Sequence, residues 1–212
     1  LLDGPVIQAA NKRALDGGFS TDSCFALIEK IRAKYPEMPI GLLLCANLVF
    51  VPTQGAFFKR CQKAGVDAVL IADLPILAAE EFVPTAKAHG IQPVFICPPN
   101  ADEATISRIA NLTEGYTYLV SRAGVTSAEN QSHAGNLDTL VESLKRSNSA
   151  PILQGFGIAK PAQVKEALVL GCDGAISGSA IVKIIERNLD NQANLIRELS
   201  AFVSEMKAAT RS

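Results

Sequence analysis

Six short, continuous apolar runs recur along this 212-residue sequence at intervals of roughly 25 to 35 residues. They are PIGLLLC at 39–45, DAVLIA at 67–72, QPVFIC at 92–97, YTYLV at 116–120, PILQG at 151–155 and GAISG at 174–178. The apolar residues of each run are mostly continuous instead of alternating with polar ones, which is typical of parallel strands that are covered on both faces. Amphipathic stretches lie between the runs and no Pro/Gly/Ser-rich linker interrupts them, so the pattern predicts one α/β domain over residues 1–212.

The amphipathic stretches predict the helices of this domain. They run over about 20–35, 54–64, 78–89, 104–112, 137–147, 160–170, 179–188 and 191–209. Ser20 or Thr21 caps the first of them and Pro36 ends it. Residues 1–5 are interpreted as the middle of a loop, and because no initiator Met precedes them the chain is expected to be truncated. A doubly wound sheet and a closed barrel both fit this alternation.

Glycines at the ends of the last two runs favour the barrel. Gly155 and Gly157 follow one run, and Gly178 lies before Ser179 after the next. A phosphate needs close backbone approach and free N–H groups, which such glycines and the start of a short helix at Ser179 provide. Two such loops after the final strands are the usual phosphate site of (β/α)₈ barrels. Taken singly, each glycine pair fits a tight strand-to-helix turn equally well.

Charge and cysteine content exclude several classes of protein. The 20 Lys and Arg nearly balance the 21 Asp and Glu, whereas a nucleic-acid partner calls for a strongly basic surface. The five cysteines form no CxxC pair, so buried thiols in a reducing cytosol are expected, with neither disulfide nor zinc. No metal site is expected, since the two histidines have no partners at metal-ligand spacing. No apolar run is long enough for a membrane span, and no signal peptide is visible.

Seven strings of the sequence carry a more specific resemblance. They are DGPVIQ at 3–8, ANLVF at 46–50, FICPPNA at 95–101, GYTY at 115–118, SRAGVT at 121–126, LQGFGI at 153–158 and GAISGSAIVK at 174–183. In this order they resemble tryptophan synthase alpha subunits of the enterobacterial type. The resemblance implies a (β/α)₈ (TIM) barrel with about six of its eight strands in this chain. The family's N-terminal helix and first two strands, with a catalytic glutamate at the end of the second, have no counterpart here.

The resemblance also implies a reaction, the cleavage of indole-3-glycerol phosphate to indole and glyceraldehyde 3-phosphate in tryptophan biosynthesis. Asp3 matches a carboxylate that accepts the indole N–H and stabilises positive charge while the ring is protonated at C3. Cleaving a bond to an aromatic carbon requires that protonation, so an acceptor carboxylate at the ring nitrogen lowers the barrier. From local sequence alone, Asp3-Gly4-Pro5 is equally an ordinary turn.

A tyrosine and a loop complete the implied catalytic region. Tyr118 matches an active-site tyrosine, although a tyrosine inside an apolar strand is more often part of the core. The polar stretch 122–136 is interpreted as a lid that excludes water, the alternative being a long solvated connection. The resemblance implies that Arg122 and Thr126 line this lid and that Thr126 contacts Asp3. It also implies that Ser127 binds phosphate through its backbone N–H, with Gly157, Gly178 and Ser179.

The indole pocket and the partner follow from the same resemblance. The pocket residues are expected to be Ile7, Leu43, Leu70, Ala72, Ile96, Phe156 and Ile176, all of which would otherwise be plain barrel core. Cys45 stands where close relatives carry tyrosine, which enlarges the pocket. The family assembles with a beta subunit into an αββα complex, and that subunit holds the pyridoxal phosphate, so no cofactor is expected in this cytoplasmic chain. Asn47, Phe50, Asp73 and Pro75 are expected in loops that face the beta subunit.

Three hypotheses remain after this reading of the sequence. The first is a carbon–carbon lyase whose second carboxylate lies outside these residues, so that the chain alone is inactive. The second is a fragment that binds only the beta subunit or phosphate ligands. The third is another phosphate-binding barrel, such as an aminosugar-phosphate isomerase. That third class requires the two glycine loops but neither Asp3-Gly4-Pro5 nor the string at 98–100.

Overall fold

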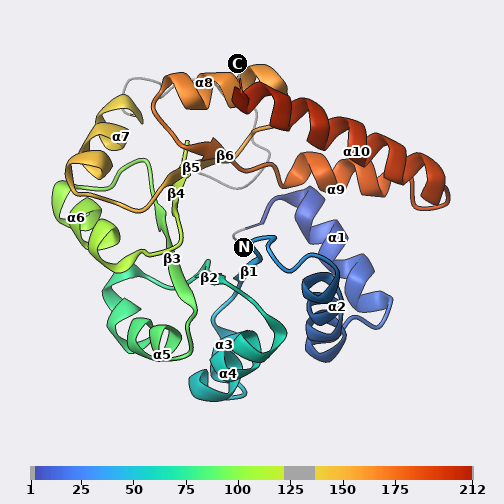
Figure 1. Ribbon diagram of the computed structural model, residues 1–212, viewed down its shortest axis with the longest axis horizontal. Coiled ribbons are helices and arrows are strands. Elements are labelled where there is room, and N and C mark those ends of the chain that lie inside the picture. Colours follow the sequence, from blue (N-terminus) through green and yellow to red (C-terminus); the bar gives the residue numbers. More distant parts are fainter. Residues whose placement is uncertain (1–2, 122–136, 212) are drawn as a thin grey trace.

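Six parallel strands lie side by side in chain order in the computed structural model, which describes residues 3–121 and 137–211 (Figure 1). They are β1 (Gly41–Leu44), β2 (Ala68–Ile71), β3 (Gln92–Cys97), β4 (Thr117–Val120), β5 (Ile152–Gly155) and β6 (Gly174–Ala175). Every neighbouring pair is parallel, with Leu43 opposite Leu70 and Ile96 opposite Tyr118. The sheet curves into a half-barrel with helices around its outside. The six predicted strands and the barrel-type fold are therefore confirmed.

Helices connect the strands, as the amphipathic stretches predicted. They are α1 (Pro5–Asp16), α2 (Thr21–Lys34), α3 (Asn47–Phe50), α4 (Gln54–Ala64), α5 (Val83–Ala88), α6 (Glu103–Leu112), α7 (Leu137–Arg146), α8 (Pro161–Val169), α9 (Ser179–Glu186) and α10 (Gln192–Ala208), with short 3₁₀ helices η1 (Ile76–Glu81) and η3 (Ala209–Arg211). Ser20 caps α2: its Oγ accepts the Ser23 N–H, and the Ser23 hydroxyl accepts the Ser20 N–H. The predicted cap at this position is confirmed.

Three segments differ from the expectation. Pro5, which was expected to lie in a loop, is the first residue of helix α1, a helix that the amphipathic stretches did not predict; Gly4 is its N-cap, and the missing N–H of Pro5 costs nothing at this position. The helix expected over 78–89 is divided into η1 and α5, because Pro84 has no N–H for the carbonyl one turn earlier. The predicted loop that holds Asn47 and Phe50 is the short helix α3.

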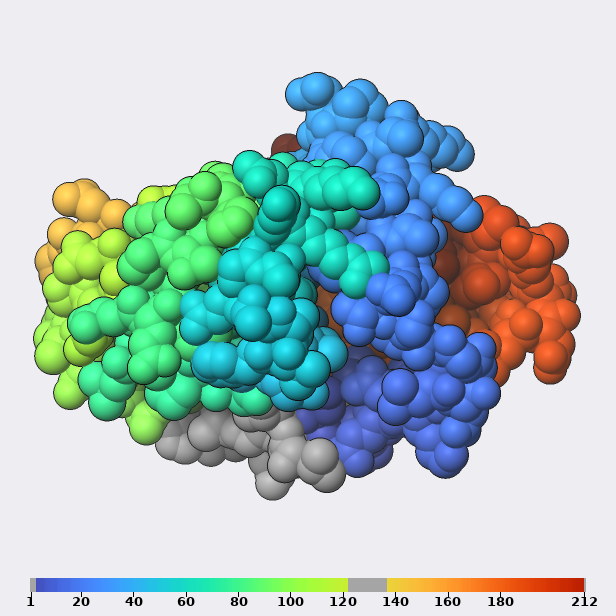
Figure 2. Space-filling model, turned by 90° about the horizontal axis from the view of Figure 1, so that it is seen from below, coloured from blue at the N-terminus to red at the C-terminus, as the bar shows by residue number. Residues whose placement is uncertain are grey.

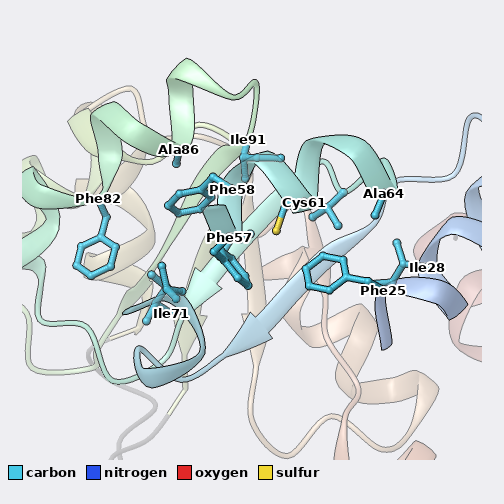
Figure 3. Packing of buried hydrophobic residues seen from close by; sticks show 13 residues of the cluster. Phe25, Ile28, Phe57, Phe58, Cys61, Ala64, Ile71, Phe82, Ala86 and Ile91 are labelled. Carbon is cyan, nitrogen blue, oxygen red and sulfur yellow. The ribbon is translucent and has the colours of Figure 1, made fainter. Parts of the chain in front are cut away.

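Two faces of the sheet bury different apolar clusters. On the outer face, one cluster packs α2, α4 and α5 against β1 and β2, with the rings of Phe25 and Phe57 edge to face at 6.1 Å between centroids (Figure 3). A second outer cluster lies under α6, α7 and α8 and includes the fully buried Leu119 and Leu144. A third cluster, on the inner face, contains Leu70 and Tyr118. The helices thus cover the outer face of the sheet, and a separate set of residues forms the apolar cluster on its inner face.

The N-terminal and C-terminal helices meet on one side of the half-barrel. Helix α1 contacts α9, and the Arg13 guanidinium lies 2.9 Å from the Glu186 carboxylate. Figure 2 shows the C-terminal helices, in orange-red, beyond the N-terminal residues in blue. Strands β1 and β6 are not paired to each other, so they are the two edges of the sheet in the described part of the chain. None of the helices described is both long and apolar enough to cross a bilayer.

Candidate active site

The carboxyl ends of all six strands face one end of the half-barrel, because the strands are parallel. Five of the seven predicted pocket residues come together there on the inner face. Leu70, Ala72, Ile96, Phe156 and Ile176 form one apolar cluster with Tyr118 and neighbouring strand residues. They come from β2 and the residue after it, from β3, from the loop after β5 and from the residue after β6. Residues far apart in sequence therefore share one apolar cluster on the inner face.

Two predicted pocket residues stand apart from this cluster. Leu43 pairs with Leu70 across β1 and β2, but its side chain is 59% exposed because β1 is an edge strand. Ile7 lies on α1 and is half-buried, outside the inner-face cluster. Among the described residues, neither side chain belongs to the inner-face cluster that the other five share.

Tyr118 fills the inner face directly opposite β5. Its ring is 8% exposed, and a Cβ atom added at Gly155 would lie 2.2 Å from its hydroxyl oxygen. The pKa of Tyr118 is raised to about 12: burial is the largest cause, nearby Tyr116 adds to the shift, and a hydrogen bond with the Phe156 backbone opposes it. The hydroxyl therefore stays protonated near neutral pH and is available as a hydrogen-bonding group.

Asp3 lies just before α1 and is held by side chains of that helix. The Asn11 Nδ2 donates to its carboxylate oxygen at 3.3 Å, and the Gln8 Nε2 donates to its carbonyl oxygen at 2.6 Å. Burial raises the pKa of the Cys45 thiol, and the charges of Asp73 and then Asp3 raise it further. Cys45 directly follows β1, at the carboxyl end of the sheet.

The loop after β5 adopts an uncommon backbone conformation. Phe156 has φ +71° and Gly157 has φ +81°, so two successive residues are in the left-handed region. For a non-glycine residue that conformation costs about 1 to 2 kcal/mol, so neighbouring contacts must maintain it. Four successive carbonyls, those of residues 155–158, accept hydrogen bonds from side chains of the flanking segments.

The second predicted phosphate element is the start of α9. Gly178 is its N-cap and is exposed, and no heavy atom lies within 4 Å of the position that a Cβ would take. Ser179 is the first residue of α9 and is half-buried. A helix N-terminus presents unpaired N–H groups and the positive end of the helix dipole, both of which favour an anion. Arg122, Thr126 and Ser127 lie outside the described residues.

Several polar side chains of this region were missed by the sequence analysis. Ser121 and Ser177, at the ends of β4 and β6, donate to the loop after β5, and Gln163 does so from the first turn of α8. A strand-terminal serine gives no signal in a sequence. Gln163 does give one, because Gln three residues after a helix cap is typical of a capping box. No cluster of His, Cys, Asp or Glu that could hold a metal occurs within the described residues.

Comparison with known proteins decides the family. The model of the "Tryptophan synthase alpha chain" family matches residues 1–211. This chain belongs to the tryptophan synthase alpha chain family. It is 83% identical over 212 residues to the alpha chain of Actinobacillus pleuropneumoniae serotype 5b (strain L20), a match over 100% of this chain and 79% of that protein. It is 70% identical over 211 residues to the alpha chain of Haemophilus influenzae (strain PittEE), covering 100% and 79%.

Solved structures agree with the family at the level of the fold. The tryptophan synthase a2b2 complex from Pyrococcus furiosus contains a chain with a TM-score of 0.87 and 31% identity, covering 98% of this chain and 82% of that chain. A structure of the tryptophan synthase A-subunit from the same organism has a TM-score of 0.83 and 30% identity, covering 97% and 81%. The tryptophan synthase alpha fold therefore accounts for the half-barrel.

Proposed function

We propose that Asp3 holds the indole ring in the reaction of this family, at the carboxyl end of the sheet. That reaction is the cleavage of indole-3-glycerol phosphate to indole and glyceraldehyde 3-phosphate by a carbon–carbon lyase of tryptophan biosynthesis. The observation that carries the proposal is the match to the family over residues 1–211, which includes Asp3, together with the apolar cluster on the inner face of the parallel strands. The carboxylate and the apolar surface together suit an aromatic ring that carries an N–H group.

The proposed chemistry requires two proton transfers. A proton reaches indole C3, and the C3 bond to the glycerol chain then breaks as the adjacent hydroxyl loses its proton and becomes the aldehyde. Positive charge develops on the ring nitrogen during the first step, and the Asp3 carboxylate stabilises it. The family resemblance assigns the proton transfers to a glutamate at the end of the family's second strand. We therefore propose that these 212 residues alone release no indole.

Tyr118 and the apolar cluster are proposed to position the ring. The Tyr118 hydroxyl, protonated because its pKa is about 12, serves as a hydrogen-bonding group beside the substrate. Leu70, Ala72, Ile96, Phe156 and Ile176 provide the apolar wall. Ile7 and Leu43 are proposed to contact the ring from α1 and the edge strand. Arg122 and Thr126 are proposed to belong to a lid over it.

The phosphate group is proposed to bind between the last two loops. Gly157 gives close backbone approach after β5, and Gly178 and Ser179 give the N-terminal N–H groups of α9. Ser127 is proposed to add a backbone N–H. Glycine at position 178 leaves open space at the helix start, which a side chain would partly fill.

The proposed partner is the beta subunit, with which the alpha chains of the Pyrococcus furiosus complex are assembled. The segments after β1 and β2 support this proposal. Leu48, Phe50, Val51 and Leu77 are exposed there, although all four are large and apolar. Asp73 accepts the Ala46 N–H at 2.7 Å and so ties the two segments together. An exposed apolar patch on linked segments is typical of a protein interface.

Indole release tests the role of Asp3. The assay compares the 212-residue chain with an extended chain, in which the N-terminal segment of the Actinobacillus relative precedes Leu1, each with and without beta subunit. We expect release only from the extended chain. Asp3→Asn in the extended chain should lower the rate about 100-fold or more, since the amide cannot stabilise the ring charge. Asp16→Asn is the control and should keep full activity, because Asp16 is an exposed aspartate at the end of α1 that pairs with Lys12.

Other outcomes of the assay separate the hypotheses. Full activity of Asp3→Asn would sink the proposed role of Asp3. Release by the short chain would contradict the need for a further carboxylate. If neither chain releases indole but both bind the beta subunit, the binding-only hypothesis takes its place.

A further inference from the structure

The loop after β5 is held by hydrogen bonds from three other segments. The single proton of the Ser121 hydroxyl, at the end of β4, is shared between the Phe156 carbonyl at 3.1 Å and the Gly155 carbonyl at 3.3 Å. The Gln163 Nε2, in the first turn of α8, donates to the Gly157 carbonyl at 2.9 Å. The Ser177 hydroxyl, after β6, donates to the Ile158 carbonyl at 3.0 Å. Three side-chain donors thus lie within hydrogen-bond distance of four consecutive carbonyls.

The N–H groups of the same loop are in a different situation. The Gly157 N–H donates no hydrogen bond to any group among the described residues, and Gly157 is exposed. This exposed N–H is open to solvent or to a ligand, whereas the neighbouring carbonyls face the side chains that hold the loop. Donors of this kind suit an anion.

Gln163 connects the two ends of this loop. Its Oε1 accepts the Ala159 N–H at 2.9 Å and the Lys160 N–H at 3.0 Å, while its Nε2 donates to Gly157. One side-chain amide therefore caps α8 and tethers the glycine. Leucine or methionine at this position would fill similar space but would lose all three bonds.

We propose that Ser121, Gln163 and Ser177 are positioning residues, which hold the loop in its left-handed conformation and so present the Gly157 N–H to the substrate phosphate. The inference rests on the proposed function, since it assumes that the phosphate binds at this loop. None of the three side chains needs to touch the substrate. Each acts through the backbone carbonyl to which it donates.

Binding of inorganic phosphate to the 212-residue chain tests the inference without requiring catalysis. Calorimetry gives the affinity, and the amide resonance of Gly157 in ¹⁵N-labelled protein reports whether the phosphate binds at this loop. We expect Ser121→Ala and Gln163→Met to weaken phosphate binding about fivefold to tenfold, the usual effect of one or two lost hydrogen bonds. Ser121→Thr keeps the hydroxyl and should restore the affinity.

A matched control separates positioning from stability. Ser149 also donates its hydroxyl to a backbone carbonyl, that of Ala150 at 3.0 Å, but it lies before β5 at the other end of the strand. Ser149→Ala should leave phosphate affinity unchanged, and urea unfolding should show a similar small loss of stability for Ser149→Ala and Ser121→Ala. In the extended chain, Ser121→Ala should raise KM for indole-3-glycerol phosphate and leave kinetics with the dephosphorylated substrate unchanged.

Two negative results are distinguishable. If the parent chain binds phosphate and shifts Gly157, but Ser121→Ala and Gln163→Met bind it equally well, the inference is wrong and the proposed phosphate site stands. If phosphate leaves the Gly157 resonance of the parent unchanged, the phosphate site itself is wrong, and the positioning role is overturned with it.

Discussion

At the scale of single residues, the ring of Tyr118 fills the space that a side chain at Gly155 would need on the inner face. A Cβ at Gly155 would lie 2.2 Å from Cζ and from the hydroxyl oxygen of Tyr118, a distance that no real contact tolerates. The tyrosine and the glycine therefore depend on each other, although 37 residues separate them in the sequence.

This dependence predicts the outcome of a double-mutant cycle. Gly155→Ala should destabilise the chain by about 1 to 3 kcal/mol, because the ring of Tyr118 must move out of a packed face. In a Tyr118→Ala background the same change should cost much less. Urea unfolding of the four proteins measures the coupling, and indole release by their extended versions reports the effect on the site. Equal costs in both backgrounds would show that the two residues do not compete for space.

Cys45 offers a chemical probe of the position of Asp3. Burial, then Asp73, then Asp3 raise the pKa of its thiol, so removing either negative charge should lower that pKa and increase the thiolate fraction at about pH 8. Asp3→Asn and Asp73→Asn should each accelerate alkylation of Cys45 about twofold to threefold. Asp16→Asn is the control. A rate unchanged by Asp3→Asn would mean that its carboxylate does not lie near the end of β1.

Alkylation should be selective because the cysteines differ in environment. Cys61, Cys97 and Cys172 are buried, whereas Cys45 is exposed, contrary to the expectation that its apolar run buries it. Burial raises the pKa of both Cys61 and Cys97 to about 12, which leaves almost no thiolate in mildly alkaline buffer. Labelled peptides from the native chain should therefore contain Cys45 and none of the three buried cysteines.

At the scale of elements, α2 depends on its N-terminal cap. Ser20→Ala removes the hydroxyl that accepts the Ser23 N–H and should cost about 1 kcal/mol of stability. Ser20→Asp keeps an acceptor and adds charge at the positive end of the helix, so it should retain the parental stability. Urea unfolding distinguishes these variants. If alanine were as stable as aspartate, the capping contact would not hold the helix in solution.

The sequence analysis predicted elements well where packing and local signals agree. Continuous apolar runs placed all six strands, and the Ser20 cap placed α2. It failed at α1, where Pro5 was interpreted as part of a turn although proline is also favoured in the first turn of a helix. It failed again at Pro84, where apolar periodicity continues across a residue that interrupts the helical hydrogen bonds.

The apolar part of the site was predictable, because its residues lie on or next to the predicted strands. The family resemblance assigned Leu70, Ile96 and Tyr118 to the site, and alternation along parallel strands explains why the three share the inner face. Leu43 obeys the same alternation, but its 59% exposure follows from being on an edge strand, which no local pattern reveals. The bonds from Ser121 to the loop after β5 depend on tertiary contact alone and could not be predicted.

At the scale of the whole molecule, the half-barrel has two strand edges in the described residues. Leu43 lies exposed on the inner face of β1, beside the inner apolar cluster. Unpaired edges and exposed apolar surface favour self-association. The 212-residue chain should therefore bind an apolar fluorescent dye and sediment in part as oligomers, and the extended chain should do both less.

Leu43→Thr in the short chain should reduce dye binding, whereas Lys59→Thr, on the outside of α4, should not. Equal dye binding by the short and extended chains would mean that the inner face is already covered.

The strands lie in the sheet in the order in which they occur in the chain, and this order affects how the chain folds during synthesis. Each strand pairs with the one synthesised before it, so β2 can dock on β1 while later residues are still within the ribosome, and no strand must wait for a distant partner. Local pairing of this kind also keeps loop-closure costs low during folding. Strands β3 and β4 lie at the centre of the sheet, with at least two strands on each side. Their amide hydrogens should then exchange most slowly, with protection decreasing toward β1 and β6.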